Sequence, residues 1–260
     1  MMSSLRTIAV AAAVLSPVAA GAQRPIIAAV LSPTSASRMA ADVLAQSKAT
    51  YAALQSYADS GTVLNEFGAN PKNPSKEVHH FRTNFRRPRS FLFDFVKHNA
   101  ADRYVVWGDD QAFHGWWRTT GVQYDYPKGQ GSGAFSGAAT QTKGSILLIP
   151  PLLFTGAGLS GTLTQFGDAE DDGKEAINGH DCFRIVGVAK DLYQTGKEVN
   201  VRKVTVWIDV KTMLIRRVFE DTPRGGVATW VSRFYTTFEP AANPRLADTV
   251  FKFTPPNSQP

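Results

Sequence analysis

The chain has 260 residues, of which 43% are hydrophobic and 11% aromatic, and its formal net charge is +6 at pH 7. This length suits one sizeable β-rich domain or two small ones. The charge is too modest to identify an anionic partner such as a membrane surface. A single cysteine, Cys182, excludes an internal disulfide, so the fold must rest on its hydrophobic core.

Residues 1–22 have the order of a secretory signal peptide. Arg6 precedes an apolar run over 8–15, and the small residues that follow end with Ala22, after which we expect cleavage. An uncleaved membrane anchor is the alternative, but the run is shorter than the roughly 20 residues that a span needs. No cysteine stands at the cleavage site to carry a lipid. We therefore expect a soluble protein that is exported to the periplasm.

An amphipathic helix is predicted after a linker over 23–37. Ser37 is a good N-cap for it, so we expect the helix to begin directly behind this residue. Its apolar and small side chains recur at helical spacing on one face, namely Ala40, Val43, Leu44, Ser47, Tyr51 and Leu54. A stripe of this kind suits a helix that lies across a sheet.

From Gly61 onward, the pattern changes to short alternating runs that are separated by turn residues. Strands are predicted near 61–68, 77–87, 89–97, 102–108, 112–118, 162–169, 174–178, 181–189, 201–209, 213–221, 227–239 and 249–253. Asn-Gly, Asp-Gly and Gly-Gly pairs between these runs favour an antiparallel sheet over βαβ units. The predicted fold class is mainly β with α, in one domain over 38–256 with a tail at 257–260.

The stretch FRTNFRRPRSFLFDF over 81–95 has the composition of a nucleic-acid platform, because bases stack on aromatic rings and phosphates pair with arginine. Its alternation separates the two kinds of side chain. The rings at 81, 85, 91, 93 and 95 share one face of the predicted strands, and most of the charges point the other way. This is typical of a sheet with one buried face, and the export signal also argues against a nucleic-acid partner.

The run GAGLSG over 156–161 matches the spacing of a dinucleotide-binding loop. Such a loop needs a strand before it and a helix after it. Two consecutive prolines precede this run, and a segment broken by glycine and acids follows it. A flexible loop is the better interpretation, and no cofactor is predicted.

The run DAEDDG over 168–173 resembles the start of a calcium-binding loop. Position twelve of such a loop is Gly179 here, where the bidentate glutamate would stand, and no helices are predicted beside it. We expect a solvated turn from Asp168 to Gly173, with calcium binding as the alternative and no metal site predicted.

No catalytic group can be assembled from the sequence. His79 and His80 are adjacent on a predicted strand and therefore point to opposite faces. Ser160 lacks the second glycine of a nucleophile elbow, and Cys182 lies in a strand-like run with only His180 near it in sequence. A buried and inert thiol is favoured over a nucleophile there. The prediction is that the protein is not an enzyme.

Hydrophobic side chains are too numerous for one sheet and one helix to cover. A packed core is one explanation, and a cavity for a long apolar ligand under a lid is the other. The residues predicted to line such a cavity are Phe91, Phe93, Phe95, Tyr104, Val106, Phe113, Trp116, Leu148, Leu152, Leu153, Phe154 and Trp207. Trp117 and Trp230 belong to the same apolar set.

Five segments in order along the chain resemble the LolA/LolB-like superfamily of periplasmic outer-membrane lipoprotein carriers. They are ALQSYADSG, FRRPRSFLFDF, WGDDQAFHGWW, VWIDVKTMLIRRVF and NPRLADTVFKFTPP. An Arg-Pro pair before an aromatic strand and a final F-x-F-x-P-P are like the family's, whereas Asp109-Asp110 stands where its hairpin usually has Asp-Gly. The chain is longer than a typical carrier, and it is nearer to the broad group of exported relatives than to the dedicated carrier.

The resemblance implies a half-barrel sheet whose concave mouth is covered by helices and which holds acyl chains. It implies that Arg87 contacts the lid, and it places the lid in the connection over 132–154. The function implied is a non-catalytic periplasmic binding or chaperone protein for acylated lipoproteins or lipids. Its partners could include inner- and outer-membrane proteins, and a monomer is expected. An envelope sensor or interaction module on the same scaffold is the alternative, and a hydrolase lacks a visible nucleophile–base pair.

Overall fold

The computed structural model describes residues 34–97, 102–109, 111–154, 158–190, 201–221 and 231–256. The predicted signal peptide, most of the predicted linker and the predicted tail lie outside the described residues, as do His98 and Trp230. None of the helices within the described part is long and apolar enough to cross a membrane.

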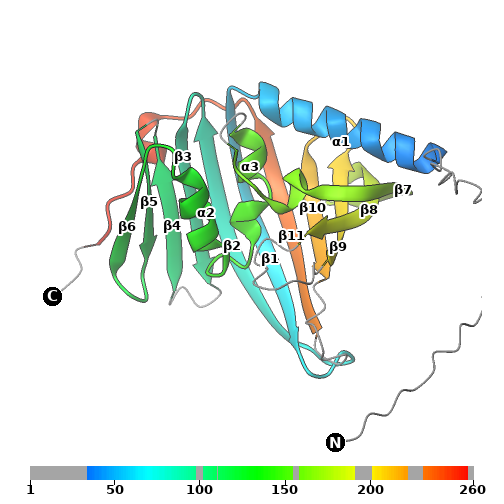
Figure 1. Cartoon of the computed structure of the whole chain (residues 1–260), viewed down its shortest axis with the longest axis horizontal. Coiled ribbons are helices and arrows are strands. Elements are labelled where there is room, and N and C mark those ends of the chain that lie inside the picture. The colour runs from blue at the N-terminus through cyan, green and yellow to red at the C-terminus, as the bar shows by residue number, and fades with distance from the viewer. Residues whose placement is uncertain are drawn as a thin grey trace, which may run out of the picture. The chain divides into compact units, whose positions relative to one another are not determined.

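Within the described residues, eleven strands form one antiparallel sheet in the order β6-β5-β4-β3-β2-β1-β11-β10-β9-β8-β7 (Figure 1). The sheet is open, with β6 and β7 at its two edges, so the predicted fold class of a half-barrel is confirmed. The strands are β1 (Ser56–Gly68), β2 (Ser75–Arg86), β3 (Ser90–Lys97), β4 (Arg103–Gly108), β5 (Ala112–Trp117), β6 (Val122–Pro127), β7 (Phe166–Ile177), β8 (His180–Lys190), β9 (Val201–Asp209), β10 (Ile215–Asp221) and β11 (Val231–Ala242).

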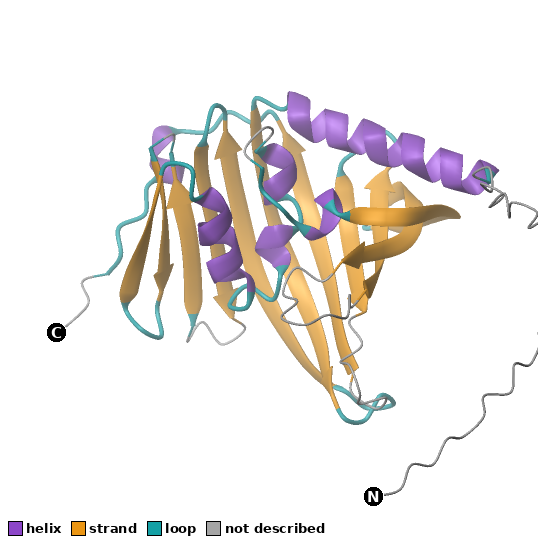
Figure 2. Cartoon of the chain, viewed as in Figure 1, coloured by secondary structure: helices purple, strands orange, loops and turns teal. Residues whose placement is uncertain are grey.

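The helical elements are short except for the first. Figure 2 shows α1 running along the ends of the strands, while α2 and α3 lie in front of the sheet. The helices are α1 (Ser35–Ala53), α2 (Gly131–Ala139) and α3 (Pro150–Leu153), and the 3-10 turns are η1 (Ser145–Leu147), η2 (Thr162–Thr164) and η3 (Asp248–Phe251). We call residues 131–154, which contain α2, η1 and α3, the lid segment.

The start of α1 corrects the predicted N-cap. The cap is Thr34, whose Oγ1 accepts a 3.1 Å hydrogen bond from the Ser37 amide, so Ser37 lies inside the first turn and the predicted linker overlaps the helix. A threonine at this position satisfies a free amide of the first turn as a serine would. The predicted face is confirmed, because Ala40, Val43 and Tyr51 are buried in the core.

The alternation predicted for 81–95 is confirmed. Phe81, Phe85, Phe91, Phe93 and Phe95 are all buried in the main core cluster. The neighbouring Leu92 belongs to a separate cluster on the other face of the sheet, with Val105 and Trp116.

Two strands differ from the prediction at one side of the sheet. β1 begins at Ser56, because it pairs with β2 from the first residue onward, with Ser56 opposite Arg86. β6 was not predicted at all. Its residues 122–125 are exposed, so they lack the apolar alternation of a half-buried strand, and pairing with β5 alone defines it.

The predicted turn at Asp168–Gly173 is wrong, since these residues lie inside β7. One strand replaces the two predicted near 162–169 and 174–178, and 162–164 form η2. The pairing of β7 with β8 shifts register twice, and Asp168 and Gly173 have positive φ angles of 47° and 90°. Bulges of this kind let acidic and glycine residues continue an edge strand. No group of three His, Cys, Asp or Glu side chains among the described residues could hold a metal ion.

α2 lies in the glycine-rich segment that sequence patterns leave without a helix. Glycine disfavours a helix, so tertiary packing must select it here. A Cβ at Gly137 would lie 2.8 Å from the hydroxyl oxygen of Tyr126, and a Cβ at Gly133 would lie 3.3 Å from the same ring. The glycines therefore allow α2 to lie directly on β6.

The predicted last strand over 249–253 is also wrong. Residues 248–251 form η3, and Phe253 packs on Trp107 and Trp116 at ring-centroid distances of 4.9 and 5.4 Å. The aromatic residues of the C-terminal segment thus cover the face of the sheet that lies opposite the main core.

Candidate functional site

Four phenylalanine rings meet between the sheet and the lid segment, and we call them the phenylalanine cluster. Phe91 comes from β3, Phe113 from β5, Phe135 from α2, and Phe154 directly follows α3. All six pairs of rings are in contact, at centroid distances from 5.3 to 6.1 Å. Most pairs are edge-to-face, the geometry that the ring quadrupoles favour. The cluster therefore joins the lid segment to the sheet through apolar contacts alone.

Most residues that were predicted to line a cavity lie around this cluster in one continuous core. Phe85 extends it, with its ring 5.1 Å from that of Phe154. The predicted residues in this core are Phe91, Phe93, Phe95, Tyr104, Val106, Phe113, Leu148, Leu152, Leu153 and Phe154. All of them are less than 9% exposed, so in this conformation their side chains fill the space between sheet and lid.

Trp116 and Trp207 lie apart from the other predicted residues. Trp116 packs with Leu92 and Val105 on the opposite face of the sheet. Trp207 packs with Cys182 in a third cluster, and its neighbours Val206 and Ile208 point into the main core. Alternation along β9 explains this, because consecutive side chains of a strand point to opposite faces.

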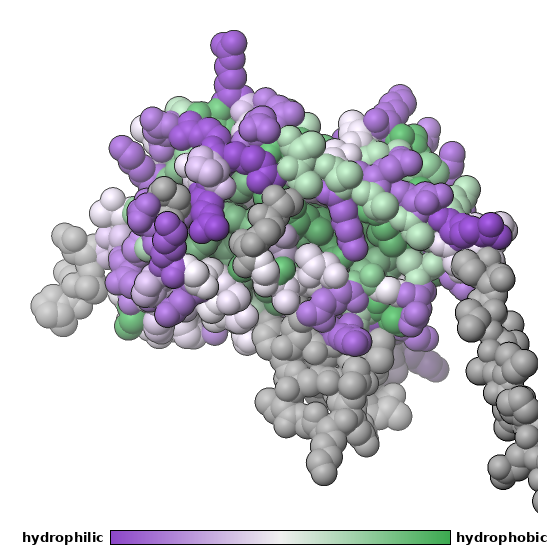
Figure 3. All heavy atoms as spheres, turned by 45° about the horizontal axis from the view of Figure 1, so that its top comes forward, coloured by the Kyte–Doolittle hydropathy of each residue, from purple (hydrophilic) through white to green (hydrophobic). Residues whose placement is uncertain are grey.

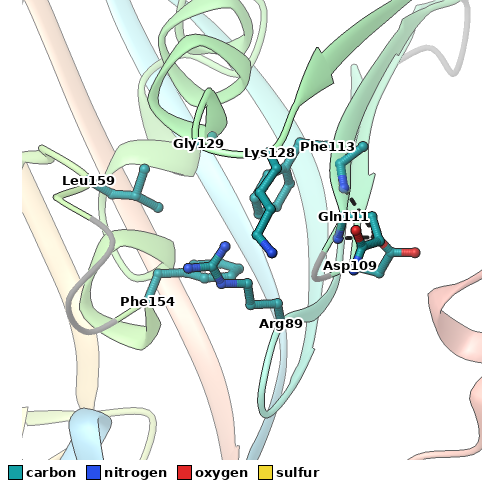
Figure 4. A pocket seen from close by; sticks show the side chains of 10 residues that line it. Arg89, Asp109, Gln111, Phe113, Lys128, Gly129, Phe154 and Leu159 are labelled. Atoms are coloured by element: carbon teal, nitrogen blue, oxygen red, sulfur yellow. Dashed lines mark hydrogen bonds between the residues drawn. The ribbon is translucent and has the colours of Figure 1, made fainter.

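A pocket of about 200 Å³ opens beside the phenylalanine cluster (Figure 4). Its apolar wall consists of Phe113, Phe154 and Leu159. Gly131, the first residue of α2, also lines it, and a Cβ there would lie 3.0 Å from the ring of Phe113. The pocket is thus continuous with the core beneath the lid segment.

Two cations stand at the rim of this pocket. Figure 4 shows the side chains of Arg89 and Lys128 pointing toward each other, with aromatic rings of the wall beside them. Arg89 is half-buried and Lys128 is exposed. The carboxylate of Asp109 also lies there, and its Oδ1 accepts hydrogen bonds of 2.8 and 3.2 Å from the amides of Gln111 and Ala112. Asp109 therefore stabilises the β4–β5 turn.

Arg87 binds the C-terminal end of α1. Its Nε donates a 2.8 Å hydrogen bond to the carbonyl of Leu54, and its Nη2 donates a 2.6 Å hydrogen bond to the carbonyl of Ala52. Its guanidinium lies 5.4 Å from the ring centre of Phe85. A helix end has carbonyls without intrahelical donors, and a cation there is favoured by the helix dipole. The contact between Arg87 and the lid stays a prediction.

A buried polar group connects η2, which follows the lid segment in the chain, to the sheet. The hydroxyl of Thr162, in η2, accepts a 3.2 Å hydrogen bond from Nη2 of Arg202 and donates a 3.1 Å hydrogen bond to Oε1 of Glu220. Nη1 of Arg202 also donates to that Oε1, at 2.9 Å. All three residues are less than 9% exposed. Because buried charges are costly unless paired, this arrangement favours one position of η2.

Among the described residues, His114 and His180 pair with Asp125 and Asp209 at 2.7 and 3.0 Å, and the thiol of Cys182 donates to the carbonyl of His180 and not to a ring nitrogen. His79 is buried and His80 is exposed, as their opposite faces predict. The pKa of His79 is lowered to about 4, chiefly because burial penalises its charged form. The pKa of the Cys182 thiol is raised to about 11, chiefly by burial and in addition by the nearby Asp209. The thiol therefore stays protonated at neutral pH, as expected for a buried and inert cysteine.

A second, wider groove of about 630 Å³ lies between α1 and the start of β7. Leu44, Ala45 and Phe166 contribute apolar surface to it, and Lys48 and Glu170 contribute charge. Figure 3 shows hydrophobic residues gathered along α1 and in the hollow beside it. This groove has mixed polarity and lies outside the phenylalanine cluster, so the pocket at Phe113 and Phe154 is the stronger candidate site.

Sequence patterns missed several residues of this site, among them Leu159, Phe135, Arg89 and Lys128. Phe135 lies in the glycine-rich segment, where no helix was predicted. Arg89 follows the Arg87-Pro88 pair, and Lys128 follows β6, which was not predicted. The sequence offers one signal for this site, which is the position of Arg89 at the start of an aromatic strand. That position does not indicate that Lys128 lies across the pocket from Arg89.

No protein-family model matches the chain, and no curated protein matches it. The chain is similar to the crystal structure of LprF from Mycobacterium bovis, with a TM-score of 0.46, 15% identity, and coverage of 86% of this chain and 99% of LprF. It is similar to the lipoprotein LppX of Mycobacterium tuberculosis, with a TM-score of 0.42, 14% identity, and coverage of 76% and 94%. It is also similar to a LolA superfamily protein from Nitrosomonas europaea, with a TM-score of 0.37, 8% identity, and coverage of 82% of this chain and 97% of that protein. The solved structures to which this chain is similar thus include a member of the superfamily that its sequence resembles. Because the sequence identities are low, the function of this chain has to be argued from its own residues.

Proposed function

We propose that the protein binds a long apolar chain, such as an acyl chain of a lipid or lipoprotein, between the sheet and the lid segment. The phenylalanine cluster carries this proposal. It is a set of large apolar side chains held against the sheet by two short helices, with a pocket leading to it from the surface. Binding would come from burial of apolar surface, at about 25 cal/mol per Å² before ordering costs are subtracted.

A long ligand requires the lid segment to move. The pocket holds about 200 Å³ in this conformation, whereas pockets for drug-sized ligands hold roughly 300–1,000 Å³. An acyl chain would therefore replace Phe135 against the sheet. Since part of the apolar gain only replaces contacts that already exist, a moderate affinity is expected, and it suits a protein that must also release its cargo.

In this proposal the protein is a non-catalytic periplasmic binding or chaperone protein. The predicted export signal supports the location, and the sequence resemblance supports the role of acyl-chain carrier. Cargo would be recognised mainly by its apolar part, because all the rings of the cluster belong to phenylalanine, which offers no hydrogen-bond donor to a head group.

The test is titration of the purified protein with a neutral environment-sensitive dye, N-phenyl-1-naphthylamine, followed by displacement with decan-1-ol. Saturable fluorescence that decanol reverses is the expected result. Native mass spectrometry of protein taken from the periplasm should in addition show bound acylated species that are released by lipid extraction. Protein that is free of lipid and gives no saturable dye binding would reject the proposed function.

A further inference from the structure

We propose that the ligand is an anionic amphiphile whose acidic head, a carboxylate or a phosphate, lies between Arg89 and Lys128 while its apolar chain lies on Phe113, Phe154 and Leu159. This inference rests on the proposed function and names the class of ligand that the same pocket takes. The juxtaposition of two cations with an apolar wall carries it.

Arg89 differs from the arginines that precede it in the chain. Arg82 pairs with Asp94 at 3.0 Å, and Arg86 pairs with Asp248 at 2.7 Å. Arg87 donates to the carbonyls at the end of α1. Among the described residues, no ion pair or hydrogen bond involves the guanidinium of Arg89, although this residue is half-buried. Its charge is the one in this segment that faces the pocket without a protein anion to neutralise it.

Lys128 adds a second positive charge that has no ion-pair partner among the described residues. Its ammonium group takes part in no ion pair within the described ranges, and it points toward Arg89 across the pocket. Two like charges that face each other repel, so their placement is favourable only when an anion lies between them. Asp109 is nearby, but two backbone amides already bind its Oδ1, and the described residues that line the pocket keep an excess of one positive charge.

The donor geometry of the two cations determines which head group fits between them. The planar guanidinium of Arg89 can donate two parallel hydrogen bonds to one carboxylate or phosphate, and Lys128 acts as a mobile point charge. The aromatic wall excludes water on one side of this site, which strengthens the attraction. A head group bound there leaves the first carbons of its chain against Phe154 and Phe113, in the direction of the phenylalanine cluster.

The experiment measures displacement of N-phenyl-1-naphthylamine by three ligands with the same chain length and different heads: decanoate, decan-1-ol and decyltrimethylammonium. We expect decanoate to bind about tenfold more tightly than decanol, since each half-exposed charge contact contributes only a few-fold. Decyltrimethylammonium should bind most weakly. The preference for decanoate should shrink as salt is raised, because salt screens exposed charges.

Two double variants with the same change in charge isolate the rim. Arg89→Gln/Lys128→Gln should remove the preference for decanoate and leave decanol binding unchanged. Arg245→Gln/Lys72→Gln is the matched control, because both of its sites are exposed and lie outside the pocket. The control should keep the preference of the natural protein.

Each other outcome rejects the inference in a distinct way. If decanoate and decanol bind equally, or if the rim variant keeps the preference, the anionic head is wrong while the proposed function stands. If inorganic phosphate alone competes as well as decanoate does, the rim is a simple anion site without an amphiphile. If neither the dye nor decanol binds, the proposed function fails, and this inference fails with it.

Discussion

Nη2 of Arg87 donates a 2.6 Å hydrogen bond to the carbonyl oxygen of Ala52, so the break between β2 and β3 is joined directly to the last turn of α1. The same guanidinium also binds the carbonyl of Leu54 through Nε. The sequence resemblance assigns this arginine to the lid, and the described hydrogen bonds give it a second task, which is to hold the N-terminal helix on the sheet.

Replacement of Arg87 by leucine should therefore destabilise the protein. The charge-assisted hydrogen bonds to carbonyls at the end of α1 are lost, and we expect the free energy of unfolding to fall by about 1–3 kcal/mol. Denaturant unfolding followed by circular dichroism measures this. Arg245→Leu is the control at an exposed position and should change little. If the two variants unfold at the same denaturant concentration, the capping role is wrong.

Phe135→Ala should create room beneath the lid segment. The substitution removes a ring that contacts the other three of the cluster, and it should cost about 3–5 kcal/mol of stability. A small apolar dye should bind the variant more tightly than the natural protein, because the ring no longer has to be displaced. Phe238→Ala removes an equally buried ring outside the pocket. It should destabilise the protein without improving dye binding, and an equal gain in both variants would contradict the model.

Thr162→Val should loosen η2. The variant keeps the shape of the side chain but loses the hydroxyl that accepts from Arg202 and donates to Glu220, at a cost of about 1–3 kcal/mol. Amide hydrogen exchange over 161–165 should become faster than in the natural protein. Thr205→Val, at a half-buried position on the same strand as Arg202, should leave that exchange unchanged. Equal exchange in all three proteins would show that the buried group does not hold η2.

Acid should affect stability through two buried groups with opposite signs. Burial raises the pKa of Asp59 to about 6, so the folded protein binds this proton more tightly than the unfolded chain does. Its contribution to stability is present below pH 4 and is lost as the pH rises through 6. The pKa of His79 is lowered to about 4, so its contribution is present above pH 6.5 and is lost as the pH falls toward 4.

The two effects overlap between about pH 4 and 6.5, and single variants separate them. Asp59→Asn should remove a gain of about 2–3 kcal/mol on acidification, leaving a protein that only loses stability as the pH falls. His79→Leu should show the reverse, with stability that increases as the pH falls from 6.5 to 4. Urea unfolding at half-unit pH intervals measures both slopes. Parallel profiles for both variants and the natural protein would contradict this assignment.

The parts of the fold that could be predicted are those whose sequence carries a regular period. Phe91, Phe93 and Phe95 alternate with polar or smaller residues, and this pattern alone assigned them correctly to one face. The parts that were missed depend on contacts between distant segments. The glycines of α2 leave room for the ring of Tyr126, and neither segment indicates a helix by itself.

The residues of the candidate site likewise divide into those that could be predicted from a periodic pattern and those that could not. Its aromatic wall could be predicted, because burial in a strand has a periodic signal. Arg89 and Lys128 could not be paired from the sequence, since one precedes β3 and the other follows β6, and only the folded sheet places both at one pocket. Charged residues at the rim of a pocket do not recur at a regular spacing in the sequence. They can be identified only when the partners around each charged group are known.

The packing of α2 on Tyr126 also determines how the lid segment can separate from the sheet. A helix of nine residues with glycine at 131, 133 and 137 is far below the roughly 12–15 residues at which isolated helices become even marginally stable in water. Separation from the sheet and loss of helical structure are therefore a single event. In the proposed function, cargo entry would be a local unfolding of α2, with a fall in helical signal that a rigid hinge would not show.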